Sequence, residues 1–134
     1  MSLTFFSIKT QERTGFVNIT GRIQEALTSS GIAEGVCTVF IPHTTAGVTI
    51  NEAADPDVVR DIIKELNTII PFQDSYAHGE GNSAAHIKAG LIGSSVSIPV
   101  QDGKLSLGTW QGIFFCEFDG PRNRSVQVVT INAR

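Results

Sequence analysis

Two of the three histidines in this chain lie close together beside a glycine-rich turn. His78 and His86 both fall in the segment SYAHGEGNSAAHIKAG, residues 75–90. Imidazole titrates near neutral pH and is a common metal ligand, so this pair indicates acid–base catalysis or metal binding. The glycines permit a tight turn that exposes backbone amides, and a helix that begins at Asn82 or Ser83 adds the positive end of its dipole. The segment therefore predicts an anion-binding turn beside two reactive side chains.

The third histidine, His43, comes at the end of an apolar, β-branched run at residues 35–45 that predicts a central strand. Functional residues concentrate at strand ends and in the loops that follow them. If this strand end meets the GEGNS turn, three imidazoles converge with Glu80 nearby. Three histidines with one open position form a known arrangement for a catalytic metal. Thr44 and Thr45 follow the strand as hydroxyl donors, and three more polar residues come shortly after: Asn51, Glu52 and Asp55.

The same residues also have purely structural explanations. Capping alone accounts for Asn82 or Ser83 at a helix start, and histidines often lie half-buried without a function. No GK[ST] follows the glycines, so the turn is not a Walker loop, and H-x7-H is not an established zinc spacing. The spacing therefore leaves acid–base chemistry, metal binding and a structural role open.

Four further residues are candidates for pairing or contact. Glu117 lies in the apolar run FFCEF and needs a cationic partner if it is buried, which Arg122 or Arg124 would supply. Arg122 could instead face an anionic ligand, since arginine suits bidentate phosphate contacts. Trp110 is expected in the core or at a subunit contact. No motif for a covalent nucleophile is present.

Several elements must position these side chains. Helices are predicted at residues 19–31, ended by Gly31, at residues 55–68, begun by Asp55-Pro56, and at residues 83–93. In the last of these, Ala84, Ile87 and Leu91 are expected on the apolar side, opposite the face of His86. Strands are expected at residues 4–11, 35–45, 47–53 and 108–118, with a hairpin around Asp102-Gly103 and a last strand at the end of the chain.

These elements predict an α+β fold, with a mixed, largely antiparallel β-sheet and two to three helices, because strands and helices alternate without a βαβ rhythm. A length of 134 residues is typical of one domain, residues 1–134, that can bury a core without a disulfide or a structural metal. We therefore interpret Cys37 and Cys116 as reduced core thiols in a cytoplasmic protein.

Charge is sparse, at 17% of residues against about 25% in an average soluble domain. This favours coverage of part of the surface by other copies of the chain. The net charge of −3 provides no basic field for nucleic acid, and no apolar run reaches the length of a membrane span. We expect no nucleic-acid partner and no membrane partner.

Three long segments together resemble the YjbQ-like family, often described as secondary thiamine-phosphate synthases. They are HTTAGVTINEAADPDVVRDI, AHGEGNSAAHIKAGLIGSSVSIPVQDGKLSLGTWQG and FFCEFDGPRNRSVQVV. The likeness runs from about residue 16 onward, and all three histidines fall on motif positions. It implies a small α+β subunit that assembles as a homotrimer. It also implies a transferase that joins hydroxymethylpyrimidine diphosphate to a thiazole phosphate and releases diphosphate.

By motif position, the resemblance assigns the catalytic site to His43, His78, His86 and Glu80. The residues expected to bind substrate or phosphate are Thr44, Thr45, Asn51, Gly81, Asn82, Ser83 and Arg122. Three histidines suit a transition metal such as zinc, whereas a diphosphate substrate would bring magnesium. Two alternatives stay open: a metal-dependent hydrolase or lyase of another substrate, and a non-catalytic trimer that binds a metal or ligand.

Overall fold

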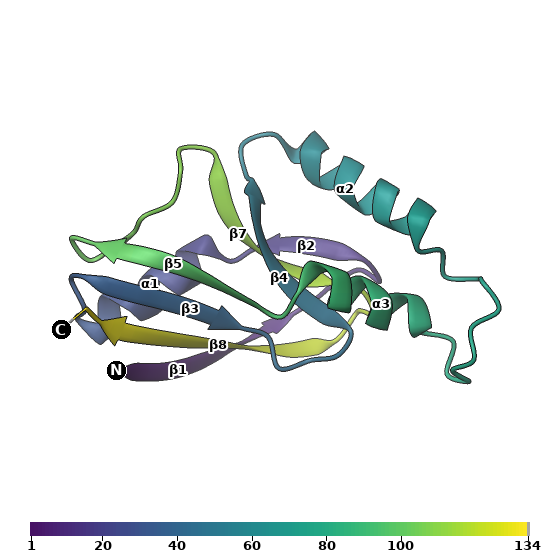
Figure 1. Cartoon of the computed structure of the whole chain (residues 1–134), viewed down its shortest axis with the longest axis horizontal. Coiled ribbons are helices and arrows are strands. Elements are labelled where there is room, and N and C mark those ends of the chain that lie inside the picture. The colour runs from purple at the N-terminus through teal and green to yellow at the C-terminus, as the bar shows by residue number, and fades with distance from the viewer. Residues whose placement is uncertain (134) are drawn as a thin grey trace.

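The computed structural model describes residues 1–133, so Arg134, the last residue of the expected domain, lies outside the described residues. Within this range three helices and eight strands are found (Figure 1). The helices are α1 (Thr20–Ser30), α2 (Pro56–Ile69) and α3 (Ser83–Ile92). The strands are β1 (Ser2–Lys9), β2 (Gly15–Asn18), β3 (Gly35–Phe40), β4 (Ala46–Glu52), β5 (Ser95–Gln101), β6 (Lys104–Leu105), β7 (Gln111–Glu117) and β8 (Asn123–Asn132).

The strands form two sheets in which every pairing is antiparallel. The five-stranded sheet has the order β1-β8-β3-β5-β6, and the three-stranded sheet has the order β2-β7-β4. The α+β prediction is confirmed, and the largely antiparallel pairing holds in both sheets. The division into two sheets was not predicted. Strand β2 was also missed, because GFVN is only four residues long.

The main core lies between the sheets and is closed by α1, which lies behind β5, β3 and β8 in Figure 1. Strand β7 is buried on both faces, which its uninterrupted apolar run explains. Ile113 and Phe115 enter this core, while Phe114 and Cys116 enter a second cluster with α2 and α3. Both cysteines are free and buried, in agreement with the prediction.

The end of α1, the start of α2 and the turn between β5 and β6 lie where the sequence predicted them. Gly31 ends α1 with a left-handed φ of 73°. The carboxylate of Asp55 accepts a hydrogen bond from the Asp57 amide at 2.9 Å at the start of α2. Asp102 and Gly103 both have positive φ, 53° and 73°, which is the conformation of a tight two-residue hairpin.

The orientation of α3 differs from the expectation. Ile87 and Leu91 are exposed (46% and 62%), whereas Lys88 is completely buried. The small side chains of Ala84, Ala85 and Ala89 face the second cluster because α3 packs closely on β4. The prediction that Ile87 and Leu91 hold the apolar side was therefore wrong.

Trp110 is 64% exposed in the turn before β7. The core position considered for it was thus wrong, and a subunit contact stays a prediction. Among the described helices, none has the length and apolarity needed to cross a membrane.

The outer face of the five-stranded sheet carries exposed apolar side chains from β1, β3 and β8. Phe5 is 71% exposed, Leu3 56% and Ile131 48%. The register sets these residues beside Val129 and Gln127 of β8 and beside Val36 and Phe40 of β3. We call the exposed residues Leu3, Phe5, Val36, Phe40 and Ile131 the outer sheet face.

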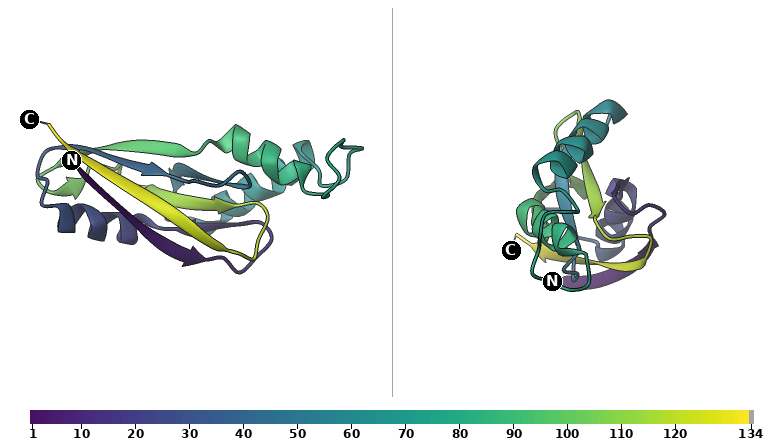
Figure 2. Two further views of the ribbon diagram at one scale, coloured as in Figure 1. Left: turned by 90° about the horizontal axis from the view of Figure 1, so that it is seen from below. Right: turned by 90° about the vertical axis from the view of Figure 1, so that its right-hand side faces the viewer.

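Helix α3 and the connection at residues 70–82 form the end of the molecule opposite the N-terminus (Figure 2). Two of the three histidines are therefore at this end. The third, His43, follows β3 in the connection to β4, and β4 packs on α3.

Candidate functional site

His86 lies on the solvent side of α3 between two open hollows. The first, of about 350 Å³, is lined by His43 and Thr44 on one side, by His86 on the other, and by small residues between them: Ala89, Gly90, Gly93 and Ser94. The second, of about 450 Å³, is lined by Tyr76, Ala77, His78, Ser83, His86 and Ile87. The fold therefore arranges the histidines in a row, with His86 in the middle.

His78 and His86 contact each other directly. Their rings meet edge to face with centroids 5.6 Å apart. The carboxylate of Glu80 lies 3.9 Å from Nε2 of His78, which is a loose ion-pair distance. Glu80 and His78 are both exposed, so this contact is open to solvent and to a ligand.

His43 is held from the opposite side by the main chain of β8. The amide of Ser125 donates to Nε2 of His43 at 2.9 Å. Partial burial of the ring lowers the pKa of His43, and the nearby Arg124 guanidinium lowers it further, while the main-chain contact at Ser125 and the Glu117 carboxylate act in the opposite direction without reversing the shift. A ring nitrogen that accepts from an amide carries no proton, so the neutral His43 carries its proton on Nδ1.

A buried ion pair lies beneath His43. Nε of Arg124 donates to Oε1 of Glu117 at 2.8 Å, and Nη2 contacts the other carboxylate oxygen. Arg124 also donates to the hydroxyl of Thr45 at 2.9 Å, and Thr10 donates to Glu117 at 2.7 Å. Burial raises the pKa of Glu117, but these hydrogen bonds outweigh burial and bring the pKa below its usual value. Of the two partners predicted for Glu117, the one that forms the ion pair is therefore Arg124.

Arg122, the other candidate partner, is paired with Asp119. Its Nε donates to the carbonyl of Asp119 at 2.7 Å and its Nη2 to the carboxylate at 2.9 Å. The same carboxylate accepts from Nδ2 of Asn82 at 3.0 Å. Asn82 therefore begins α3 without capping it, and its buried Oδ1 has no hydrogen-bond partner among residues 1–133. Burial raises the pKa of Asp119, but the bonds from Asn82 and Arg122 outweigh it, so the net shift is downward.

The predicted substrate-binding residues divide into two groups. Thr44 and Ser83 line the hollows, and Gly81 turns the chain before α3 with a φ of 81°. Thr45 is buried on Arg124, so its hydroxyl serves the ion pair. Asn51 lies near the far end of β4, where its Oδ1 accepts from the Glu52 amide, and it lines neither hollow.

Sequence reasoning missed several residues that line the hollows. Tyr76 lines the hollow of His78 and donates to the carbonyl of Pro71. Gly93 and Ser94 line the hollow of His43, and Gly93 lies so close to Gly47 of β4 that a side chain at Gly47 would meet its carbonyl. The glycine that ends α3 was visible in the sequence, but its approach to β4 was not.

The three histidines do not fit the predicted three-ligand metal site as they stand. Among residues 1–133, no three His, Cys, Asp or Glu side chains are grouped so that they could hold a metal ion. Nε2 of His43 is occupied by the Ser125 amide, and a protonated Nδ1 has no lone pair to offer a metal. One chain therefore offers at most His78 and His86.

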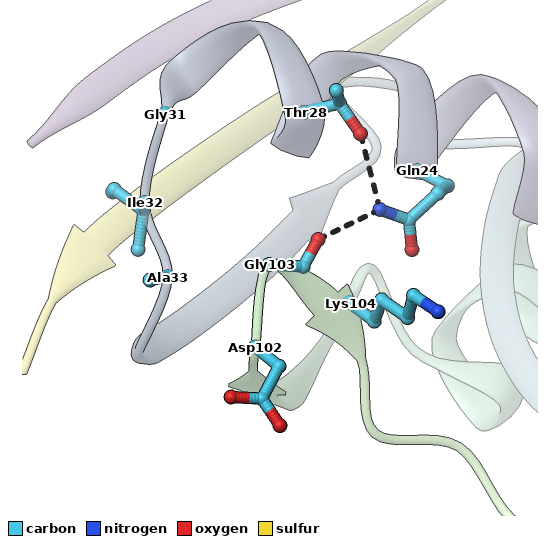
Figure 3. Close-up of a pocket in the computed structure, with 8 residues that line it drawn as sticks. All are labelled: Gln24, Thr28, Gly31, Ile32, Ala33, Asp102, Gly103 and Lys104. Atoms are coloured by element: carbon cyan, nitrogen blue, oxygen red, sulfur yellow. Dashed lines mark hydrogen bonds between the residues drawn. The ribbon is translucent and has the colours of Figure 1, made fainter.

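A further hollow, of about 600 Å³, lies elsewhere, between α1 and the β5–β6 hairpin (Figure 3). The amide of Gln24 points across it and donates to the Gly103 carbonyl and the Thr28 hydroxyl. Its carbonyl oxygen accepts from the Leu105 amide. Gln24 thus fastens the hairpin to α1, and we assign this hollow a structural role.

Comparison with known proteins gives a consistent result. The family model described as UPF0047 protein YjbQ-like matches residues 4–133. The UPF0047 protein MJ1081 of Methanocaldococcus jannaschii is 52% identical over 126 residues, 94% of this chain and 91% of the relative. The UPF0047 protein YugU of Bacillus subtilis is 45% identical over 127 residues, 94% and 96% of the two chains.

Solved structures agree with this match. An uncharacterized YjbQ/UPF0047 family protein from Clostridium acetobutylicum is 54% identical, with a TM-score of 0.94 over 96% of this chain and 99% of that chain. A hypothetical protein from Aeropyrum pernix K1 is 38% identical and has the same TM-score over 98% and 99% of the two chains.

Proposed function

This chain belongs to the YjbQ-like UPF0047 family, and from that premise we propose that it is an enzyme acting on a small phosphorylated molecule. The observation that carries the proposal is the row of histidines, in which His86 lines one hollow with His43 and another with His78. Three imidazoles along one open strip provide proton donors and acceptors over the length of a small molecule.

The named version of the proposal is a thiamine-phosphate-synthase-like transferase. In this reaction a thiazole nitrogen attacks the methylene carbon of hydroxymethylpyrimidine diphosphate, and diphosphate leaves with the electron pair of the broken C–O bond. Negative charge then grows on the leaving group and must be stabilised by donors. His78, His86 and Ser83 beside the start of α3 are the groups we assign to this charge, with Glu80 as an acceptor for His78.

The remaining predicted contacts follow from the same assignment. We propose that Thr44 donates to the ligand from the His43 side. Arg122 has a half-exposed guanidinium whose Nη1 is not committed to Asp119, so it would approach a phosphate oxygen through that nitrogen. The inward hydrogen bonds of Thr45 and the distance of Asn51 from the hollows give no support to a substrate role for either.

A divalent metal ion remains a separate proposal. His78 and His86 suit a transition metal such as zinc, and the other ligands would come from the substrate or from another copy of the chain. Magnesium would instead arrive with a diphosphate. The contact between His78 and His86 suits both alternative functions, a metal-dependent hydrolase or lyase and a non-catalytic trimer that only binds a metal or ligand.

Self-association is proposed as a homotrimer. The outer sheet face supports it, since a large apolar surface on a soluble chain marks an interaction site. Ser125 belongs to the same strand face and donates to His43, so the site adjoins this surface. We also propose a cytoplasmic location, which two free buried cysteines support, and no nucleic-acid or membrane partner.

The test measures release of diphosphate from hydroxymethylpyrimidine diphosphate and thiazole phosphate, with wild type beside His78→Ala and His86→Ala. We expect turnover in the wild type and a loss of at least about 100-fold in both variants, in the range for removal of a general acid–base group. Lys104→Ala is the matched control, because Lys104 lies at the opposite end of the molecule in the structural hollow. Turnover equal in all four proteins would exclude this site. Activity that follows added zinc without the pyrimidine substrate would favour the hydrolase or lyase.

A further inference from the structure

We infer that His43 is a fixed, neutral hydrogen-bond donor, whose Nδ1–H contacts an uncharged acceptor of the bound molecule, and that it is not a metal ligand. This inference rests on the proposed function for the existence of a bound molecule. It assigns His43 a role different from that of His78 and His86, although the three lie in one row.

The Ser125 amide decides the tautomer. A backbone amide can only donate, and it points at Nε2 of His43 from 2.9 Å. Nε2 must therefore present a lone pair. A neutral imidazole carries one proton on its two nitrogens, so the proton is on Nδ1.

The buried ion pair makes a second proton on this ring unfavourable. Arg124 is the residue before Ser125, and its guanidinium is fixed by Glu117 and Thr45. A charged His43 would place a cation beside this guanidinium and would set an N–H against the Ser125 amide. Glu117 offsets part of this repulsion, but its carboxylate oxygens already accept from Arg124, Thr10 and the Asp119 amide. Arg124 and Ser125 are therefore positioning residues for His43.

The hollow that His43 lines suits an uncharged part of a ligand. The side chains that line it with the two histidines are small and uncharged, and none of them is Asp, Glu, Lys or Arg. Its floor follows the second half of α3 toward Gly93, where the helix dipole presents its negative end. A phosphate is disfavoured there and favoured near Ser83, at the start of the same helix. The bound molecule would thus lie along α3 with its phosphate toward His78 and a carbonyl oxygen or ring nitrogen toward His43.

Binding of a metal by His43 would require the opposite tautomer. A lone pair on Nδ1 forces the proton onto Nε2, where it would face the Ser125 amide, and the amide would lose its acceptor. An unsatisfied donor pair of this kind is costly in a partly buried position. The geometry therefore separates His43 from any metal held by the other two histidines.

The direct test is a long-range proton–nitrogen NMR spectrum of the full chain labelled with ¹⁵N at its three histidines. Loss of one set of signals in His43→Asn assigns that ring. We expect a protonated Nδ1 and an unprotonated Nε2 at neutral pH, with no change at His43 on addition of zinc or of inorganic phosphate. An Nε2-protonated ring, or a shift of His43 caused by either probe, would overturn the inference.

Two variants test the role in turnover. The Asn side chain carries its amide at the position of Nδ1, whereas the Gln side chain reaches the position of Nε2. We expect His43→Asn to retain a higher kcat/KM than His43→Gln, because the Asn amide can still donate to the ligand. His43→Gln should retain the Ser125 contact and stability but lose about tenfold in kcat/KM, the effect of one neutral hydrogen bond. The reverse order of activity would overturn the donor role.

These results separate the inference from the proposed function. A wild type without turnover refutes the synthase proposal, and the tautomer spectrum then decides the state of His43 alone. Turnover with an Nε2-protonated His43 upholds the enzyme and refutes the inference.

Discussion

Arg124 and Glu117 form an ion pair that is almost fully withdrawn from solvent, with side chains 5% and 1% exposed. Thr10, Thr45 and the Asp119 amide complete the hydrogen bonding of the pair. Because the pair joins β7 to β8 beneath His43, its integrity affects both the fold and the site.

Arg124→Met is expected to lower the free energy of unfolding by about 3–5 kcal/mol, because it leaves Glu117 buried without a counter-ion. Urea unfolding measures this loss. Arg122→Met is the matched control, since its pair with Asp119 is half-exposed and should contribute at most about 1 kcal/mol. Equal effects of the two substitutions would show that burial does not govern the strength of these pairs.

The lowered pKa of Glu117 predicts that the fold loses stability in acid. Its pKa is lowered in the folded chain, so the folded state binds the proton less tightly than the unfolded state. The stabilisation is fully present above the unfolded pKa, near 4.5, and is lost as the pH falls through the lower folded value. Urea unfolding between pH 3 and pH 7, a range of about four units around that pKa, should show this fall. The fall should be shallower in Glu117→Gln, and it should not vanish, because Asp119 has a lowered pKa as well. An unchanged slope in Glu117→Gln would contradict the assignment.

Boundaries of helices and strands that depend on residues close together in the sequence were predictable. Gly31, Asp55-Pro56 and Asp102-Gly103 act through their own backbone and side-chain geometry, so the ends of α1, the start of α2 and the hairpin were correctly placed. The double-sided burial of β7 followed from its composition.

Features that depend on distant partners were not predictable. The sequence of α3 suggests Ile87 inside and Lys88 outside, but the contacts of Lys88 with Asn67 and Phe72 reverse this orientation. The contact between Ser125 and His43 spans 82 positions and leaves no local pattern. The histidine motif identified the residues of the site, whereas their separate roles required the fold.

Removal of the positive charge of Lys88 is expected to increase the stability of the fold. Its amine is buried against the Phe72 ring and donates to Asn67 at 2.5 Å, and no carboxylate pairs with it in the described residues. Burial, with a smaller effect of Arg13, lowers its pKa below the unfolded value of 10.5. Protonation therefore costs stability at neutral pH, and stability is recovered as the pH rises from the folded toward the unfolded pKa.

Lys88→Met should accordingly be as stable as the wild type or more stable at pH 7, with a difference that narrows in alkaline solution. Thermal unfolding between neutral and alkaline pH measures this, and exposed Lys104→Met serves as the control, within about 0.5 kcal/mol of wild type. A large loss of stability in Lys88→Met would mean that the contacts with Asn67 and Phe72 outweigh the burial of the charge.

The two thiols are predicted to be unreactive in the native chain. Burial raises the pKa of Cys37 to about 11 and raises that of Cys116 further. Thiolate, the reactive form, is therefore scarce at pH 8, and both sulfurs are inaccessible. Mass spectrometry after iodoacetamide treatment should show no label in buffer and two labels in urea. Labelling of Cys37 in buffer would indicate local opening of β3.

We expect the homotrimer to form through the outer sheet face and not through the exposed side of α3. Phe5→Asp places a charge at the most exposed aromatic of that face, and burial of an unpaired carboxylate opposes association. We expect light scattering to show a trimer for the wild type and a smaller species for Phe5→Asp. Circular dichroism should remain unchanged, because Phe5 is 71% exposed and belongs to neither core cluster of the described residues.

Leu91→Asp is the matched control, since Leu91 is similarly exposed, at 62%, but lies on α3. It should remain trimeric if the outer sheet face forms the interface. Dissociation by Leu91→Asp alone would move the interface to α3, beside His86, and would make the neighbouring subunit part of the site. Because Ser125 extends from the outer sheet face to His43, dissociation by Phe5→Asp should also weaken turnover, while His43 keeps its tautomer.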